Sequence, residues 1–194
     1  VIPNNFFTNK LRRFCNVLFF ENTYINKKVE KIFINLLERI KPDIIHFEHL
    51  IWLSTTLIDV ANQFNIPTLL TLHDYWFMCP NIQLLRYDYT ICKGPEPNKC
   101  RVCWIRKQME AAFEILEGSC IPKFLARNFL EFAFKAFNPA VKFGERNEYI
   151  KSLLLKADKI IAPSKFLKKT FIRYGIPENK IVYSENGYNL DAFK

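Results

Sequence analysis

A histidine and an aspartate follow an apolar segment in the first half of the chain. Residues 66–70 have the composition of a buried strand, and His73 and Asp74 lie just beyond its end. In open α/β sheets, ligands bind outside the carboxyl ends of the strands. Packing alone does not require two ionisable side chains at such a point. The pair therefore predicts a ligand-binding or catalytic site centred on His73 and Asp74.

Polar groups also follow the other predicted strands, one group for each strand. The groups are His46 with Glu48 and His49, His73 with Asp74, Ser164, and Asn186 with Gly187. Since the carboxyl ends of parallel strands meet at one edge of a sheet, we expect all four groups along that edge. Ser164 also begins a predicted helix, whose free N–H groups and dipole suit an anion.

Taken one at a time, most of these residues also have an ordinary structural interpretation. A histidine at a strand end can cap a backbone carbonyl, and Ser164 caps a helix in any case. Asn186 and Gly187 form a common turn dipeptide. The convergence of the four groups on one edge is what favours a functional site.

Hydrophobic periodicity predicts the elements that would position these residues. We expect helices over residues 24–40, 54–64, 105–117, 145–156 and 164–174, and strands over residues 43–47, 68–72, 159–162 and 181–183. A strand, a helix and a strand within about thirty residues form the crossover of a parallel sheet. The sequence therefore predicts an α/β fold with a Rossmann-like parallel sheet flanked by helices.

Four of the six cysteines lie in one long irregular segment, residues 74–104. The spacing C-x12-C-x7-C-x2-C joins Cys79, Cys92, Cys100 and Cys103. Four thiolates suit a tetrahedral zinc ion, and closed four-cysteine sites are structural. We therefore predict a structural zinc ion that fixes this loop beside His73. Reduced thiols without a metal, and a redox pair at Cys100 and Cys103, are the alternatives.

The composition limits the classes of function. The chain has 194 residues, 49% of them hydrophobic, enough for one domain with a sizeable core or for a part of a larger protein. Five glycines without a Gly-rich run argue against a P-loop or a G-x-G-x-x-G site in these residues. No apolar stretch reaches the roughly 18 residues of a spanning helix, and the first residues do not resemble a signal peptide. We therefore expect a cytoplasmic location.

The formal net charge is +9, and residues 121–170 contain eleven Lys and Arg against four Asp and Glu. Such a surface suits phosphate, nucleic acid or an anionic membrane face, although an ordinary basic surface has the same composition. Aromatic residues among these charges fit a peripheral position at the inner membrane face.

A zinc-stabilised nucleic-acid-binding protein and a non-catalytic α/β domain are competing interpretations. The nucleic-acid interpretation does not explain the polar groups at the strand ends, and the Cys loop is not strongly basic, so we expect no nucleic-acid partner.

The ordered set of motifs resembles the N-terminal half of the GT-B glycosyltransferases of family 4. The matching segments are residues 41–49 (KPDIIHFEH), 66–76 (IPTLLTLHDYW), 157–164 (ADKIIAPS), 175–177 (GIP) and 180–187 (KIVYSENG). They follow one another in the family's order and spacing. The loop with four cysteines resembles a Cys-bearing subgroup of the same family.

The resemblance implies a retaining transfer of a sugar from a UDP-linked, GDP-linked or similar nucleotide sugar, without a catalytic metal ion. The N-terminal domain would hold a glycan or lipid-linked acceptor, as in surface polysaccharide biosynthesis. His73 would lie close to the acceptor or the transferring sugar, with Asp74 positioning it. The substrate-binding residues carried over in this way are His46, Glu48, His49, Ser164, Asn186 and Gly187.

The same resemblance predicts how the chain is divided. Residues 1–194 would form a single partial Rossmann-like N-terminal domain, in which residues 74–104 are a Cys-rich insertion and residues 185–194 begin an interdomain linker. The family's opening strand with its Gly-rich loop, and its C-terminal donor-binding domain, do not occur in this sequence. We therefore expect the chain by itself to be inactive.

Overall fold

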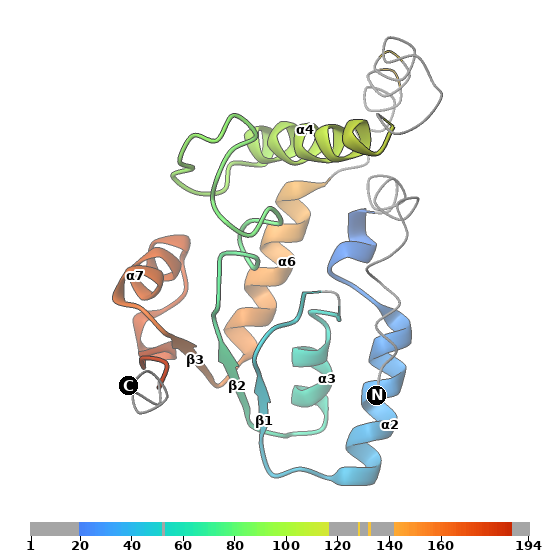
Figure 1. Ribbon diagram of the computed structural model, residues 1–194. Helices are drawn as coiled ribbons and strands as arrows, with labels where there is room; N and C mark the ends of the chain where they lie inside the picture. Colours follow the sequence, from blue (N-terminus) through green and yellow to red (C-terminus); the bar gives the residue numbers. More distant parts are fainter. Residues whose placement is uncertain (1–19, 52, 117–127, 129–131, 133–141, 188–194) are drawn as a thin grey trace, which may run out of the picture.

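The structure is a computed structural model that describes residues 20–51, 53–116, 128, 132 and 142–187 (Figure 1). A four-stranded parallel sheet forms its centre. The strands are β1 (Ile45–Phe47), β2 (Thr68–Thr71), β3 (Lys159–Ala162) and β4 (Ile181–Tyr183), in the order β1-β2-β3-β4. All neighbouring strands are parallel, with Phe47 opposite Leu70 and Leu70 opposite Ile160. The predicted α/β class and the Rossmann-like parallel sheet are confirmed.

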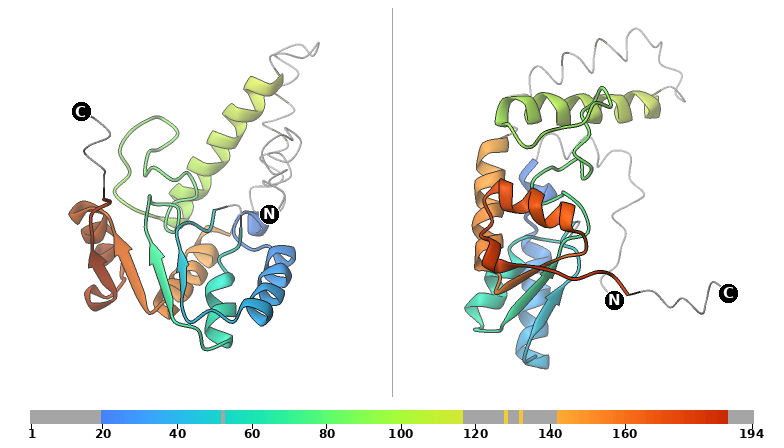
Figure 2. Two further views of the ribbon diagram at one scale, coloured as in Figure 1. Left: turned by 60° about the horizontal axis from the view of Figure 1, so that its bottom comes forward. Right: turned by 90° about the vertical axis from the view of Figure 1, so that its left-hand side faces the viewer.

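Helices pack against the sheet and against one another. They are α2 (Lys27–Ile40), α3 (Leu57–Gln63), α6 (Phe143–Lys156) and α7 (Lys165–Tyr174), with the 3-10 turns η1 (Phe20–Thr23) and η3 (Glu178–Lys180). Helix α3 lies between α2 and α6, while α7 packs against β3 and β4 (Figures 1 and 2). The apolar side chains that face inward form one core, which includes Ile58, Leu70, Ile150, Leu154, Ile160 and Phe171.

The local sequence sets the ends of these helices. The side chain of Asn26 caps the start of α2, and the helix ends at Lys41, whose φ of 48° is left-handed. Pro42 explains that end, because a residue before proline avoids the right-handed α conformation. Ser164 caps α7 and Gly175 ends it with a φ of 104°, as predicted.

The main difference from the sequence prediction is helix α4 (Pro97–Leu116). The predicted helix starts at Ile105, whereas α4 starts eight residues earlier and includes Cys100 and Cys103. Pro97 is compatible with this start, because an N–H group in the first turn has no helical partner. The irregular segment therefore ends before α4 rather than at Trp104. In Figure 1 the chain rises from β2 through this segment to α4, which lies above the sheet.

Part of the basic region lies outside the described residues, including most of residues 121–141. The prediction that this region contacts a membrane falls largely on them. Across the ranges that the structure does describe, no helix is both long enough and apolar enough to cross a bilayer.

Candidate active site at the ends of strands β1 and β2

Glu48 lies between two histidines just beyond the end of β1. Its Oε2 atom accepts a hydrogen bond from Nε2 of His73 at 2.8 Å, and its Oε1 atom lies 3.4 Å from Nε2 of His46. The Nε2 atom of His46 is also 2.7 Å from Oγ1 of Thr71. The side chains of Glu48 and His73 are 62% and 38% exposed. A polar ligand can therefore reach a carboxylate and an imidazole at this edge of the sheet.

His49 and Asp74 form a second pair. The backbone N–H of Ile51 donates to Nδ1 of His49 at 2.9 Å, so the ring proton lies on Nε2. Nε2 donates that proton to Oδ2 of Asp74 at 2.9 Å, while Oδ1 of Asp74 accepts the backbone N–H of Trp76 at 2.7 Å. These contacts fix the orientation of the His49 ring and hold the start of the loop after β2.

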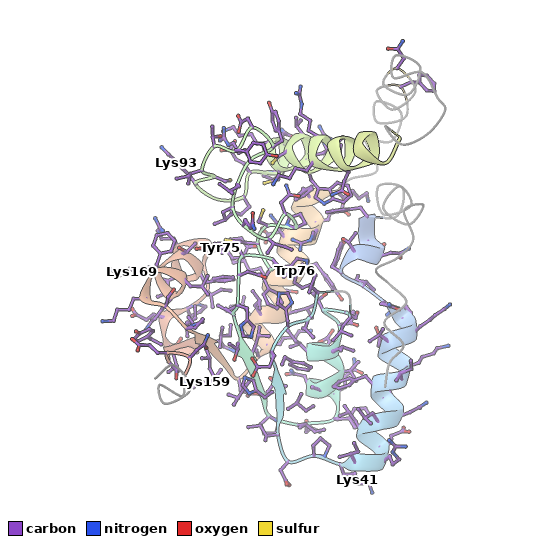
Figure 3. All side chains as sticks on the ribbon, in the orientation of Figure 1. Lys41, Tyr75, Trp76, Lys93, Lys159 and Lys169 are labelled. Atoms are coloured by element: carbon purple, nitrogen blue, oxygen red, sulfur yellow. The ribbon has the colours of Figure 1, made fainter. Side chains whose placement is uncertain are left out.

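The two pairs belong to one cluster. The rings of His49 and His73 are nearly parallel, with an interplanar angle of 11° and a centroid separation of 6.3 Å. The buried ring of Trp76 lies 5.8 Å from that of His49. Figure 3 shows Tyr75 and Trp76 where the chain leaves β2, below the loop that carries Lys93. The more exposed pair, His73 and Glu48, is thus the ligand-accessible part of the cluster.

The carboxylate that contacts His73 directly is Glu48, whereas Asp74 contacts His49. The role of Asp74 in positioning His73 stays a prediction, and it would act through His49 and the loop rather than by direct contact. The two neighbouring residues thus have different partners, just beyond the end of β2. The side-chain contacts across the two strand ends all join residues 25 apart: His46 with Thr71, Glu48 with His73, and His49 with Asp74.

The predicted residues at the ends of β3 and β4 do not join this cluster. The Oγ atom of Ser164 accepts the N–H of Leu167 at 3.1 Å, which is its helix-capping contact. Asn186 and Gly187 are exposed. Among the residues described, no hydrogen bond or ion pair connects these three to the histidines. The structure therefore brings together five of the predicted site residues: His46, Glu48, His49, His73 and Asp74.

Some polar contacts near the strand ends were not predicted from the sequence. The Thr71 hydroxyl contacts the His46 ring, and the backbone N–H of Trp76 donates to the Asp74 carboxylate. At the end of β4, the Tyr183 hydroxyl donates a hydrogen bond to Glu185, which raises the pKa of Tyr183. The Nζ atom of Lys165, at the start of α7, lies 5.5 Å from the centre of the Tyr183 ring. The sequence signal for the contact between Tyr183 and Glu185 is a Tyr-x-Glu pattern that begins at the last residue of a strand.

The four predicted metal ligands, Cys79, Cys92, Cys100 and Cys103, line one cavity of about 520 Å³ as free thiols. Within the described ranges, no three His, Cys, Asp or Glu side chains are close enough together to hold a metal ion as they stand. Burial raises the pKa of Cys79, while backbone hydrogen bonds from Asn81 and Leu84 lower it. Burial likewise raises the pKa of Cys100 to about 11. Thiols that stay protonated are poor nucleophiles, which argues against the redox alternative.

Comparison with known proteins adds one finding to this geometry. Residues 128–192 match the model of Glycosyltransferase Family 4. The match supports a glycosyltransferase family 4 type domain. It covers about a third of the chain, including α6, β3, α7 and β4. It also supports a glycosyltransferase-like function, with a sugar donor and an acceptor as substrates in general. Searches of curated proteins and of solved structures find no match.

Proposed function

We propose that this chain is the acceptor side of a retaining glycosyltransferase that uses a nucleotide sugar. The observation that carries the proposal is the exposed pair of His73 and Glu48 at the carboxyl edge of a parallel sheet. Ligands of α/β sheets bind at this edge. Both groups suit the hydroxyls of a sugar, because the carboxylate accepts hydrogen bonds and the imidazole can accept or donate one. The family match at residues 128–192 supports the same class of reaction.

Each pair in the cluster has a proposed role. His73 contacts the acceptor or the transferring sugar, and Glu48 orients its ring through the 2.8 Å hydrogen bond. Asp74 and His49 keep the start of the loop after β2 in place, so that His73 stays at the cleft. The reaction needs no metal ion at this cluster, because the developing charges are stabilised by hydrogen bonds and by the donor-binding side.

The ends of β3 and β4 are proposed to face the donor. The start of α7 presents free N–H groups beyond the Ser164 cap, and Lys165 adds a positive charge. This combination suits the phosphates of a UDP-linked or GDP-linked sugar. Asn186 and Gly187 would then begin a linker to a second domain that binds most of the nucleotide.

The proposed setting is surface polysaccharide biosynthesis in the cytoplasm. A glycan or lipid-linked acceptor would bring the protein to the inner face of the membrane, where the basic region 121–170 would contact anionic lipids. Binding of the protein to anionic but not to neutral vesicles, weakened by salt, would support this setting. Equal binding to both vesicles would contradict it.

The proposal is tested by nucleotide release from a panel of UDP-linked and GDP-linked sugars. The protein is the product of the complete gene, so that any second domain is present, and extracted glycolipids serve as acceptors. We expect acceptor-dependent release that falls about a hundredfold or more in His73→Ala. Lys31→Ala, at an exposed position of α2 and outside the basic region, is the control and should match the native protein. Release that is absent for every donor, or unchanged in His73→Ala, would contradict the proposal.

A further inference from the structure

We propose that Cys79, Cys92, Cys100 and Cys103 bind one zinc ion that ties the loop after β2 to the start of helix α4. Two of the thiols come from the loop and two from the helix. Cys100 and Cys103 are three residues apart on α4, so both lie on one face of the helix. All four thiols line the same cavity of about 520 Å³. Four cysteines around one cavity are a donor set that suits tetrahedral zinc.

Three of the four sulfur atoms, those of Cys79, Cys100 and Cys103, accept hydrogen bonds, as a metal-bound thiolate would. The backbone N–H of Glu96 donates to Sγ of Cys100 at 3.2 Å, and Nδ2 of Asn81 donates to Sγ of Cys103 at 3.5 Å. The backbone N–H groups of Asn81 and Leu84 point to Cys79. Groups that donate to a ligand atom orient it and tune the metal.

Cys92 is the exception, because its own S–H donates to the carbonyl of Gly94 at 3.2 Å. Metal binding would remove that proton. As the thiols stand, no three of them are close enough together to hold an ion. Zinc binding therefore requires the loop to close around the ion, with Cys92 turning away from Gly94. This closure is a measurable consequence of the proposal.

The loop between β2 and α4 contains several residues with left-handed backbone. Ile82 and Leu84 have φ values of 72° and 51°, and Tyr89 has a φ of 62°. Left-handed backbone is uncommon for residues other than glycine, and most costly for a β-branched side chain such as Ile82. Between β2 and α4, turn hydrogen bonds and one isolated bridge, from Leu85 to Ile91, order the loop within itself. A metal ion would add a bond between this loop and α4.

A buried positive charge lies next to the turn that presents Cys79. Arg146 of α6 is completely buried, and one of its terminal nitrogens donates to the carbonyl of Trp76 at 2.8 Å. Its other terminal nitrogen donates to Oδ1 of Asn147 at 3.2 Å. Within the described ranges no carboxylate pairs with Arg146, and its Nε atom has no hydrogen-bond partner. A buried charge is costly unless an opposite charge is near. Zinc with four thiolates carries a net negative charge, which is the kind of centre that this guanidinium would offset.

The first measurement is the zinc content of the native full chain, purified without chelator from cells supplied with zinc. We expect about one zinc ion per chain, as in closed four-cysteine sites. Cobalt substitution should give the absorption bands of a tetrahedral cobalt–thiolate centre. This readout uses the native protein and does not depend on how any variant folds. A disulfide between any two of the four cysteines in the native protein, or zinc content no higher than in a metal-free control protein, would overturn the proposal.

Variants then identify the ligands. Serine replacements of Cys79, Cys92, Cys100 and Cys103 should each lose zinc, whereas Cys15→Ser and Cys120→Ser should keep it. Removal of zinc with a chelator should increase proteolytic cleavage in residues 80–96, and restored zinc should reverse the change. Full zinc retention in any two of the four variants, or loop cleavage that does not respond to zinc, would contradict a four-cysteine site.

Discussion

At the residue scale, Glu48 is the group that connects the two strands. Its carboxylate contacts His73 at 2.8 Å and lies 3.4 Å from His46. Because the carboxylate is charged, its hydrogen bond to His73 is stronger than one between neutral groups. The orientation of the proposed substrate-contacting ring therefore depends on Glu48.

We predict that Glu48→Gln lowers kcat about tenfold to a hundredfold, because the amide keeps the shape but loses the charge. KM for the acceptor should change less, since His73 is still present. Steady-state kinetics on the product of the complete gene measure this difference. Glu178→Gln is the matched control, since Glu178 lies in η3 and its side chain is 74% exposed. An equal loss of activity in both variants would contradict a positioning role for Glu48.

The identities of the site residues could be predicted from the sequence, but their partners could not. His73 and Asp74 are conspicuous because they follow an apolar strand. Which of them contacts Glu48 depends on the register between β1 and β2 and on the path of the chain beyond the strand ends. Two short strands do not reveal either from the sequence, so the direct partner of each residue could not be predicted.

Arg146 allows a test of the proposed zinc centre at the residue scale. We predict that Arg146→Met weakens zinc binding about tenfold or more, because a buried cation near the thiolates is lost. Competition with a chromophoric chelator measures the affinity. Lys151→Met is the control, since Lys151 lies on the same helix with its Nζ atom 5.6 Å from the Tyr174 ring. Equal zinc affinity in Arg146→Met and the native protein would show that the guanidinium does not support a metal centre.

At the element scale, the start of α7 has a confirmed structural role and a proposed functional one. We predict that Ser164→Ala lowers the free energy of unfolding by about 1 kcal/mol, because the N–H of Leu167 loses its acceptor. Urea unfolding measures this loss. Ser152→Ala in α6 is the control, since Ser152 is exposed and bonds only to the Tyr149 carbonyl of its own helix. If both variants lose the same free energy, the cap is not the stabilising contact.

The elements with regular periodicity could be predicted, whereas α4 shows where sequence reasoning fails. The strands β3 and β4 have the predicted limits, and α7 begins at its predicted cap. The start of α4 differs from the prediction because Gly94, Pro95 and Pro97 indicate a loop when read alone. Trp104 packs against Phe20 with a centroid separation of 4.8 Å, a contact between distant parts of the chain. Tertiary packing of this kind stabilises α4 but leaves no local signal in the sequence.

At the scale of the whole molecule, the raised pKa of a buried tyrosine predicts how the free energy of unfolding depends on pH. Burial, the largest cause, raises the pKa of Tyr24 to about 12, from an ordinary value of 10.0. Between these values the unfolded chain loses the phenolic proton while the folded chain keeps it. The unfolded state therefore binds fewer protons, and the free energy of unfolding falls as the pH rises.

We predict that this alkaline loss is smaller in Tyr24→Phe, by up to about 1.4 kcal/mol per pH unit. Urea unfolding at a series of pH values above pH 9 measures the slope. The exposed Tyr89 provides the control variant, Tyr89→Phe, which should retain the native slope. A slope in Tyr24→Phe equal to that of the native protein would show that Tyr24 does not carry the effect.

The central claim is that the cluster at the ends of β1 and β2 serves sugar transfer. Its most direct test is to analyse the product formed from a labelled nucleotide sugar by the product of the complete gene. We predict that the label becomes attached to the acceptor, that its anomeric configuration is retained, and that His73→Ala lowers product formation about a hundredfold or more. A label that stays on the nucleotide or appears only as free sugar with every donor would contradict the claim. An inverted configuration would contradict the retaining mechanism.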